Sequence, residues 1–90
     1  MCSYIVESAE LIGSAKGPRG WMRVNAANVY YDHPYHAPLD HALTIDFLAP
    51  TGAIGDRVAV ELSAESAWSL VEKILTALNH GEDAHGEWEE

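Results

Sequence analysis

Three histidines within nine residues, His33, His36 and His41, form the part of this sequence best suited to chemistry. Neutral imidazole is the commonest protein ligand for zinc, and it also binds copper, nickel and iron. Pro34 and Pro38 stiffen the backbone between the histidines, which lowers the entropic cost of presenting three ligands together. The spacing predicts a site for a divalent transition metal, with zinc as the expected ion.

A fourth ligand could come from two kinds of side chain. Cys2 supplies a thiolate if the first strand passes beside the histidines. Alternatively, an aspartate either binds the ion or orients an imidazole ring through its second nitrogen; the candidates are Asp32, Asp40 and Asp46. A position left open to water would let the ion act as a Lewis acid, whereas a closed set of four ligands would make it structural.

The same segment also fits interpretations without a metal. Tyr30, Tyr31 and Tyr35, together with Trp21, could wall a small aromatic pocket for an organic ligand. Asp32 and Asp40 are further candidate ligand-binding residues. A plainer interpretation is that Asp-His-Pro is a turn whose neighbouring histidines are hydrogen-bonded at a strand edge.

Alternating sequences on both sides of this segment predict the strands that position it. Residues 42–48 alternate cleanly, with Leu43, Ile45 and Phe47 on one side, and residues 57–62 alternate again. Asp46 and Glu61 fall on the outward sides of these two strands. They form a conceivable acid–base pair, but a solvated face is the default expectation for them.

The first third of the chain predicts a less regular arrangement. Residues 2–8 are rich in β-formers and continue loosely through Ile12. Residues 13–20 contain three glycines and a proline, which predicts a loop or a wide hairpin connection. Strand-like sequence resumes at Trp21, with Trp21 and Val24 as core candidates, and continues over residues 27–32.

One helix is expected, from Ala64 to Asn79. Ser63 offers an N-cap oxygen, and Glu65 lies in the first turn, where a negative charge is favourable. The apolar stripe repeats at three- and four-residue spacing; it comprises Ala67, Leu70, Val71, Ile74, Leu75 and Leu78. Asn79-His-Gly is a stop signal, and residues 81–90 form an acidic tail.

These elements predict an α+β fold: an antiparallel sheet of four or five strands with one C-terminal helix on one face, all within residues 1–80. One helix is narrow for such a sheet, so part of the face could be left uncovered. A homodimer through that face or through a sheet edge is therefore a plausible arrangement.

Composition narrows the classes of partner. Fourteen acidic residues against five basic ones give the 90-residue chain a net charge of −9, which argues against nucleic acid and against an anionic membrane. The N-terminus lacks a signal pattern and no stretch is long enough to span a bilayer. A single cysteine excludes an internal disulfide and fits a reducing, cytoplasmic location.

Three blocks together resemble a family of short bacterial proteins of unknown function. They are Met-Cys-Ser-Tyr at the start, Gly-Ser-Ala-Lys-Gly-Pro-Arg-Gly-Trp ending at Trp21, and Tyr-Asp-His-Pro-Tyr-His-Ala-Pro-Leu-Asp-His ending at His41. The similarity covers nearly the whole chain except the acidic tail. The resemblance implies no activity and no catalytic residue.

The sequence therefore supports two hypotheses from different classes. The first is a small protein that binds a divalent transition metal through His33, His36 and His41, with catalysis left open. The second is a metal-free homodimeric binding or accessory module in which the histidine and tyrosine segment lines an interface or an organic-ligand pocket.

Overall fold

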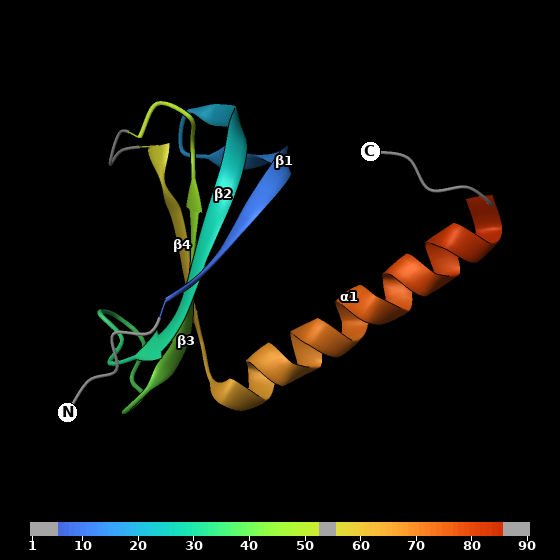
Figure 1. Cartoon of the computed structure of the whole chain (residues 1–90). Coiled ribbons are helices and arrows are strands. Elements are labelled where there is room, and N and C mark those ends of the chain that lie inside the picture. The colour runs from blue at the N-terminus through green and yellow to red at the C-terminus, as the bar shows by residue number, and fades with distance from the viewer. Residues whose placement is uncertain (1–5, 53–55, 86–90) are drawn as a thin grey trace.

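The chain folds into four strands followed by one helix, as a computed structural model that describes residues 6–52 and 56–85 shows (Figure 1). The elements are β1 (Glu7–Gly17), β2 (Gly20–Asp32), β3 (Ala42–Leu48), β4 (Val58–Leu62) and α1 (Ala64–His85). The strands form one antiparallel sheet in the order β1-β2-β3-β4. The predicted α+β class, with four antiparallel strands and a C-terminal helix, is confirmed.

The β1–β2 hairpin is longer and tighter than its sequence predicts. Instead of the expected loop over residues 13–20, β1 continues to Gly17 and a two-residue turn leads into β2. Gly20, with a φ of 106°, allows this turn because a residue with a Cβ rarely adopts that backbone conformation. Val24 is buried as predicted, but the prediction of Trp21 as a core residue is wrong, since 71 % of it is exposed.

Strand register divides the sheet into two chemically different faces. Val29, Ile45 and Val60 lie opposite one another across β2, β3 and β4, as do Tyr31, Leu43 and Leu62. These residues, with Phe47 and Val58, define the apolar face. The alternate positions define the polar face, which carries Asn28, Tyr30, Thr44, Asp46 and Glu61.

Burial of the two faces is the reverse of what their chemistry suggests. Thr44 and Asp46 on the polar face are 4 % and 5 % exposed, so the expectation of a solvated Asp46 is wrong. The connection over residues 33–41 hydrogen-bonds to the polar face and lies on the side of the sheet away from α1 (Figure 1). By contrast, Leu43 and Ile45 on the apolar face are only partly buried.

Helix α1 begins as the sequence predicts and ends later. The Ser63 hydroxyl accepts a hydrogen bond from the Ser66 backbone N–H at 3.1 Å, and Glu65 lies in the first turn. The predicted end at Asn79 is wrong, because the helix continues through Gly81 to His85. Residues 86–90 of the predicted tail lie outside the described ranges. Within those ranges, no helix is long and apolar enough to cross a membrane.

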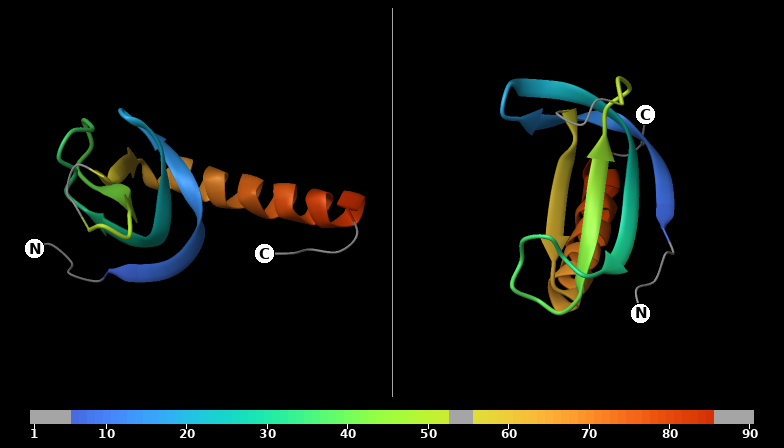
Figure 2. Two further views of the ribbon diagram at one scale, coloured as in Figure 1. Left: turned by 90° about the horizontal axis from the view of Figure 1, so that it is seen from above. Right: turned by 90° about the vertical axis from the view of Figure 1, so that its left-hand side faces the viewer.

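Only the first turns of α1 approach the sheet. A single residue, Ser63, separates β4 from α1, and the helix then extends away from the sheet at a wide angle (Figures 1 and 2). The radius of gyration is 14.8 Å, whereas a compact domain of this length has about 12 Å. The apolar stripe of α1 therefore remains open; Ile74 is 50 % and Leu75 is 57 % exposed.

Candidate functional site

The carboxylate of Glu61 organises the histidine-bearing connection. The backbone N–H groups of Tyr35, His36 and Ala37 donate to its two oxygens at 2.6, 3.0 and 2.8 Å. Three successive amides that converge on one anion form a backbone nest. The nest fixes the middle of the connection to β4, which lies about 25 residues later in the chain.

These hydrogen bonds stabilise the charged form of Glu61. The N–H of Ala37, followed by that of Tyr35, lowers the pKa of the Glu61 carboxyl below its usual value of 4.5. The alternation of residues 57–62 indicated only that Glu61 lies on the outward side of its strand. The sequence did not predict that Glu61 binds backbone amides, because these amides lie about 25 residues earlier in the chain and no pattern near Glu61 indicates them.

The connection should consequently loosen at low pH. A group with a lowered folded-state pKa contributes its full stabilisation above about pH 4.5, and the contribution is lost as the pH falls through the folded pKa. We expect the protection factors of the amide protons of residues 35–37, which correct the exchange rates for the intrinsic effect of pH, to fall at least several-fold below about pH 4.5, as measured by NMR. Glu61→Gln should show this lower protection already at pH 7.

A matched change on the helix serves as the control. Glu72 is exposed on α1, so Glu72→Gln should leave the exchange of residues 35–37 unchanged. Equal exchange rates in Glu61→Gln and in the unmodified chain at pH 7 would contradict the anchoring role of this carboxylate.

Two of the three histidines stack on each other at the end of the sheet. The ring centroids of His33 and His41 lie 4.7 Å apart, and His41 stacks in turn on Tyr31 at 5.7 Å. The His33 Nδ1–H donates to the backbone carbonyl of Asp40 at 2.9 Å. We call Tyr31, His41 and His33 the aromatic ladder.

His36 is held apart from this ladder. Its backbone is bound by Glu61 on the polar face, and its neighbours there are Ala37, Pro38 and Ala59. Among the side chains that the structure describes, those of residues 6–52 and 56–82, no group of three or more His, Cys, Asp and Glu could hold a metal ion together. The predicted ligand Cys2 lies outside these ranges, so the metal site remains a prediction.

The residues predicted to wall an organic-ligand pocket are dispersed. Tyr35 is 93 % exposed, and Trp21 lies at the opposite end of β2 from the histidine connection. The Asp32 carboxylate accepts the His33 backbone N–H at 2.7 Å, while Asp40 contributes its backbone carbonyl to the same residue. Of the predicted set, Tyr35 and Trp21 line two separate hollows of about 650 and 200 Å³, and Tyr31 borders a third, apolar one.

That hollow is an apolar groove between the sheet and the helix, with a volume of about 580 Å³. The apolar face of the sheet forms one wall and the first turns of α1 form the other. The groove is lined by Val29, Tyr31, Leu43, Ile45, Leu62, Ala64, Ala67, Trp68, Leu70, Val71 and Ile74. Its lining is almost wholly apolar, and the aromatic ladder begins at its end, at Tyr31.

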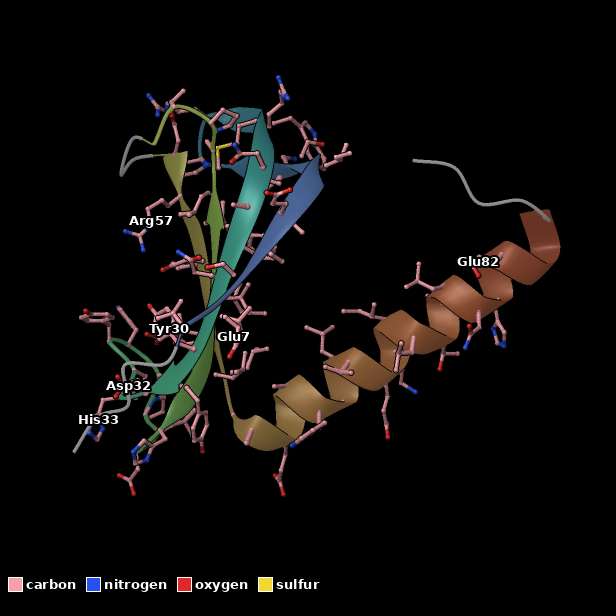
Figure 3. All side chains as sticks on the ribbon, viewed as in Figure 1. Glu7, Tyr30, Asp32, His33, Arg57 and Glu82 are labelled. Carbon is pink, nitrogen blue, oxygen red and sulfur yellow. The ribbon has the colours of Figure 1, made fainter. Side chains whose placement is uncertain are left out.

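A partly buried charge pair lies on the polar face. Arg57 Nη2 donates to Asp46 Oδ2 at 2.6 Å, and the Tyr30 hydroxyl donates to the same oxygen over a long 3.4 Å. Tyr30 and Arg57 both lie on the side of the sheet away from α1 (Figure 3). Burial, then the Asp46 charge, raises the pKa of the Tyr30 hydroxyl. Asp46 and Glu61 therefore have separate partners and do not act as a pair.

The glycine-rich hairpin turn carries a second ion pair. Arg19 Nη2 lies 2.7 Å from Asp56 Oδ1, and Thr51 donates to the other oxygen of that carboxylate at 3.0 Å. Here the Arg19 side chain is 77 % exposed. The arginine of this turn therefore already has a carboxylate partner.

Comparison with known proteins adds a family but no activity. No curated protein and no solved structure matches this chain. The model of a family of unknown function, DUF6295, matches residues 1–88. That match covers nearly the whole sequence, including all three blocks on which the resemblance rests. The chain therefore belongs to this family of unknown function, DUF6295.

Proposed function

We propose that this protein is a homodimeric binding module in which the apolar groove of each copy receives helix α1 of the other copy. The observation that carries the proposal is that two apolar surfaces of one chain are both open. The apolar face of the sheet is half covered, and the stripe of α1 is 40–57 % exposed at Leu70, Val71, Ile74, Leu75 and Leu78.

Mutual exchange would cover both surfaces at once. The groove has a sheet wall and a helix wall, so an apolar helix placed in it contacts both. The direction of α1 supports an exchange between copies, because after a connection of one residue the helix extends away from its own sheet (Figure 1). A two-fold axis makes the arrangement closed, since each copy then gives a helix and receives one.

The open stripe of α1 is long enough for such an interface. From Leu70 to Leu78 it extends over about 12 Å at 1.5 Å per residue. A second copy brings an identical stripe, so it is the occupant that this surface favours over a small ligand.

The aromatic ladder would lie at the rim of this interface. Tyr31 belongs to the groove and stacks on His41, which stacks on His33. Tyrosine and histidine are amphipathic, and such residues suit the boundary between an apolar contact and water. This placement gives the histidine segment a role in the module that requires no metal.

Light scattering coupled to size-exclusion chromatography tests the proposal. Twice the chain mass of 9.8 kDa is expected at micromolar concentration. A chain that remains monomeric at several hundred micromolar would contradict it, and a monomer that binds an apolar dye in the groove would make the groove a ligand site instead.

Metal binding is decided by a separate measurement. In the proposed module, hydrogen bonds from the nest to Glu61 organise the histidine connection, so chelator should leave the melting temperature unchanged. Stoichiometric zinc in untagged protein purified without chelator, reduced in His36→Ala, would instead support the metal hypothesis.

A further inference from the structure

We propose that a pocket on the polar face, beside Asp46, binds a small neutral ligand with an N–H donor next to a carbonyl acceptor, as in lactams and pyrimidine bases. The pocket has a volume of about 410 Å³, within the range of small-molecule sites. It lies between β2, β3 and the segment before β4, on the face opposite the apolar groove. The dimer proposal is not needed for it.

A buried carboxylate oxygen supplies the first half of the recognition. Among the residues that the structure describes, Asp46 Oδ1 is buried without a hydrogen-bond partner, whereas Oδ2 is bound by Arg57 and Tyr30. Asp46 lines the pocket and is only 5 % exposed. Oδ1 has almost no accessible surface, so a ligand N–H reaches it only when side chains at the pocket wall move aside. An unpaired buried acceptor is costly, so a ligand N–H that reaches Oδ1 in this way gains more than it would at an exposed carboxylate.

Arg57 supplies the second half. Its side chain is 41 % exposed and borders the same pocket, and a guanidinium has five N–H donors, of which the bond to Asp46 uses one. A ligand carbonyl can accept from this group while a neighbouring N–H of the ligand donates to Asp46. The pocket thus presents an acceptor and a donor side by side.

The charges of the pair select a neutral ligand. Asp46 and Arg57 carry opposite unit charges whose nearest atoms are 2.6 Å apart, so the pair is neutral overall. The nearby guanidinium would repel a metal cation, and the nearby carboxylate would repel an anion. Amide-type ligands avoid both repulsions and match both hydrogen-bonding groups.

Small side chains leave the room for this ligand. Ala26 on β2 lies opposite Leu48 on β3, and Ala26, Leu48 and Ala49 contribute apolar surface to the pocket. Ala26 lines the pocket and is partly exposed, so a larger side chain at this position would extend into the pocket. This position therefore offers a way to block the site.

NMR titration of the full ¹⁵N-labelled chain tests the proposal. Uracil and 2-pyrrolidone should cause saturable shifts at the amides of Asn28, Asp46 and Gly52, with a Kd of about 1 mM for ligands of this size. Acetate, which only accepts hydrogen bonds, and guanidinium, which only donates them, each carry a net charge and should cause no saturable shifts. Ala26→Leu should weaken uracil binding at least tenfold.

Two further variants sharpen the result. Ala59→Leu makes the same change on the polar face but outside this pocket, so it should bind uracil as the unmodified chain does. In Asp46→Asn the amide oxygen can keep the bond from Arg57, which places an NH2 donor in the position of Oδ1. This variant should also weaken uracil binding tenfold. If it does not fold, the result for Ala26→Leu tests the proposal. The proposal is overturned if neither uracil nor 2-pyrrolidone causes saturable amide shifts, or if acetate causes equal shifts. It is also overturned if Ala26→Leu binds uracil with unchanged affinity.

Discussion

Replacing Ile74 with glutamate is expected to convert the proposed dimer into a monomer. Ile74 lies in the middle of the α1 stripe and lines the groove. A charge placed in a dry interface costs about 3 kcal/mol or more, which raises the dimer Kd at least roughly 100-fold. In the single chain Ile74 is half exposed, so the change should leave the sheet itself intact.

The helix should respond more than the sheet. Isolated helices are marginal in water, and most of α1 has no contact with its own sheet. Separation of the two copies should therefore reduce the helical circular dichroism signal, and dilution of the unmodified protein should do the same at its Kd. Light scattering and circular dichroism on one concentration series measure both effects.

Ser69→Glu provides the matched control. Ser69 is exposed on the opposite side of α1 from the apolar stripe, so a charge there should change neither the mass nor the helical signal. The exchange of helices would be contradicted if Ile74→Glu kept the mass of the unmodified protein, or if both variants dissociated equally.

The parts of this fold that the sequence predicted are those set by local signals. The alternation of residues 42–48 and 57–62 and the Ser63 cap depend on neighbours a few residues apart, and β3, β4 and the start of α1 agree with them. The β1–β2 hairpin was harder to predict from the sequence, because glycines that usually indicate a loop lie within β1 and at the start of β2.

The face of the sheet that becomes buried could not be read from alternation. Alternation separates Ile45 from Asp46 but does not say which side other parts of the chain will cover. Here the covering groups are distant in sequence: the connection reaches the polar face through Glu61, and Arg57 reaches Asp46 from the start of the next strand. Because these groups cover the polar face, the apolar face stays open. The sequence indicated this only because it predicts a single helix, which is too narrow to cover the sheet.

The same reasoning explains the outcome for the histidines. Their spacing of three and five residues suits a common metal ion, but strand direction places the rings of His33 and His41 beside Tyr31 and leaves His36 with Glu61 on the polar face. The backbone nest that determines this division uses only amide groups, which carry no signature in the sequence.

Arg57→Met is expected to destabilise the fold strongly. Removing one partner of a fully buried ion pair costs about 3–5 kcal/mol, because the other charge stays buried without compensation. Asp46 has 7 % of its side chain exposed, whereas Arg57 has 41 %, so water screens part of the pair. We expect a loss of about 2 kcal/mol, or a melting temperature lower by roughly 8–16 °C, measured at equal protein concentration because dimers melt by mass action.

The other arginine pair provides the control for this change. Arg19→Met breaks an ion pair of nearly the same length, 2.7 Å, but with side chains 77 % and 26 % exposed, so it should cost less than about 1 kcal/mol. The double variant Asp46→Leu with Arg57→Met removes the stranded charge and should recover stability relative to Arg57→Met alone. Equal losses of stability in Arg57→Met and Arg19→Met would show that the burial of Asp46 does not increase the cost of breaking its ion pair.

The double variant has a further possible outcome. If it is less stable than Arg57→Met alone, Asp46 stabilises the polar face through groups other than Arg57, such as Tyr30.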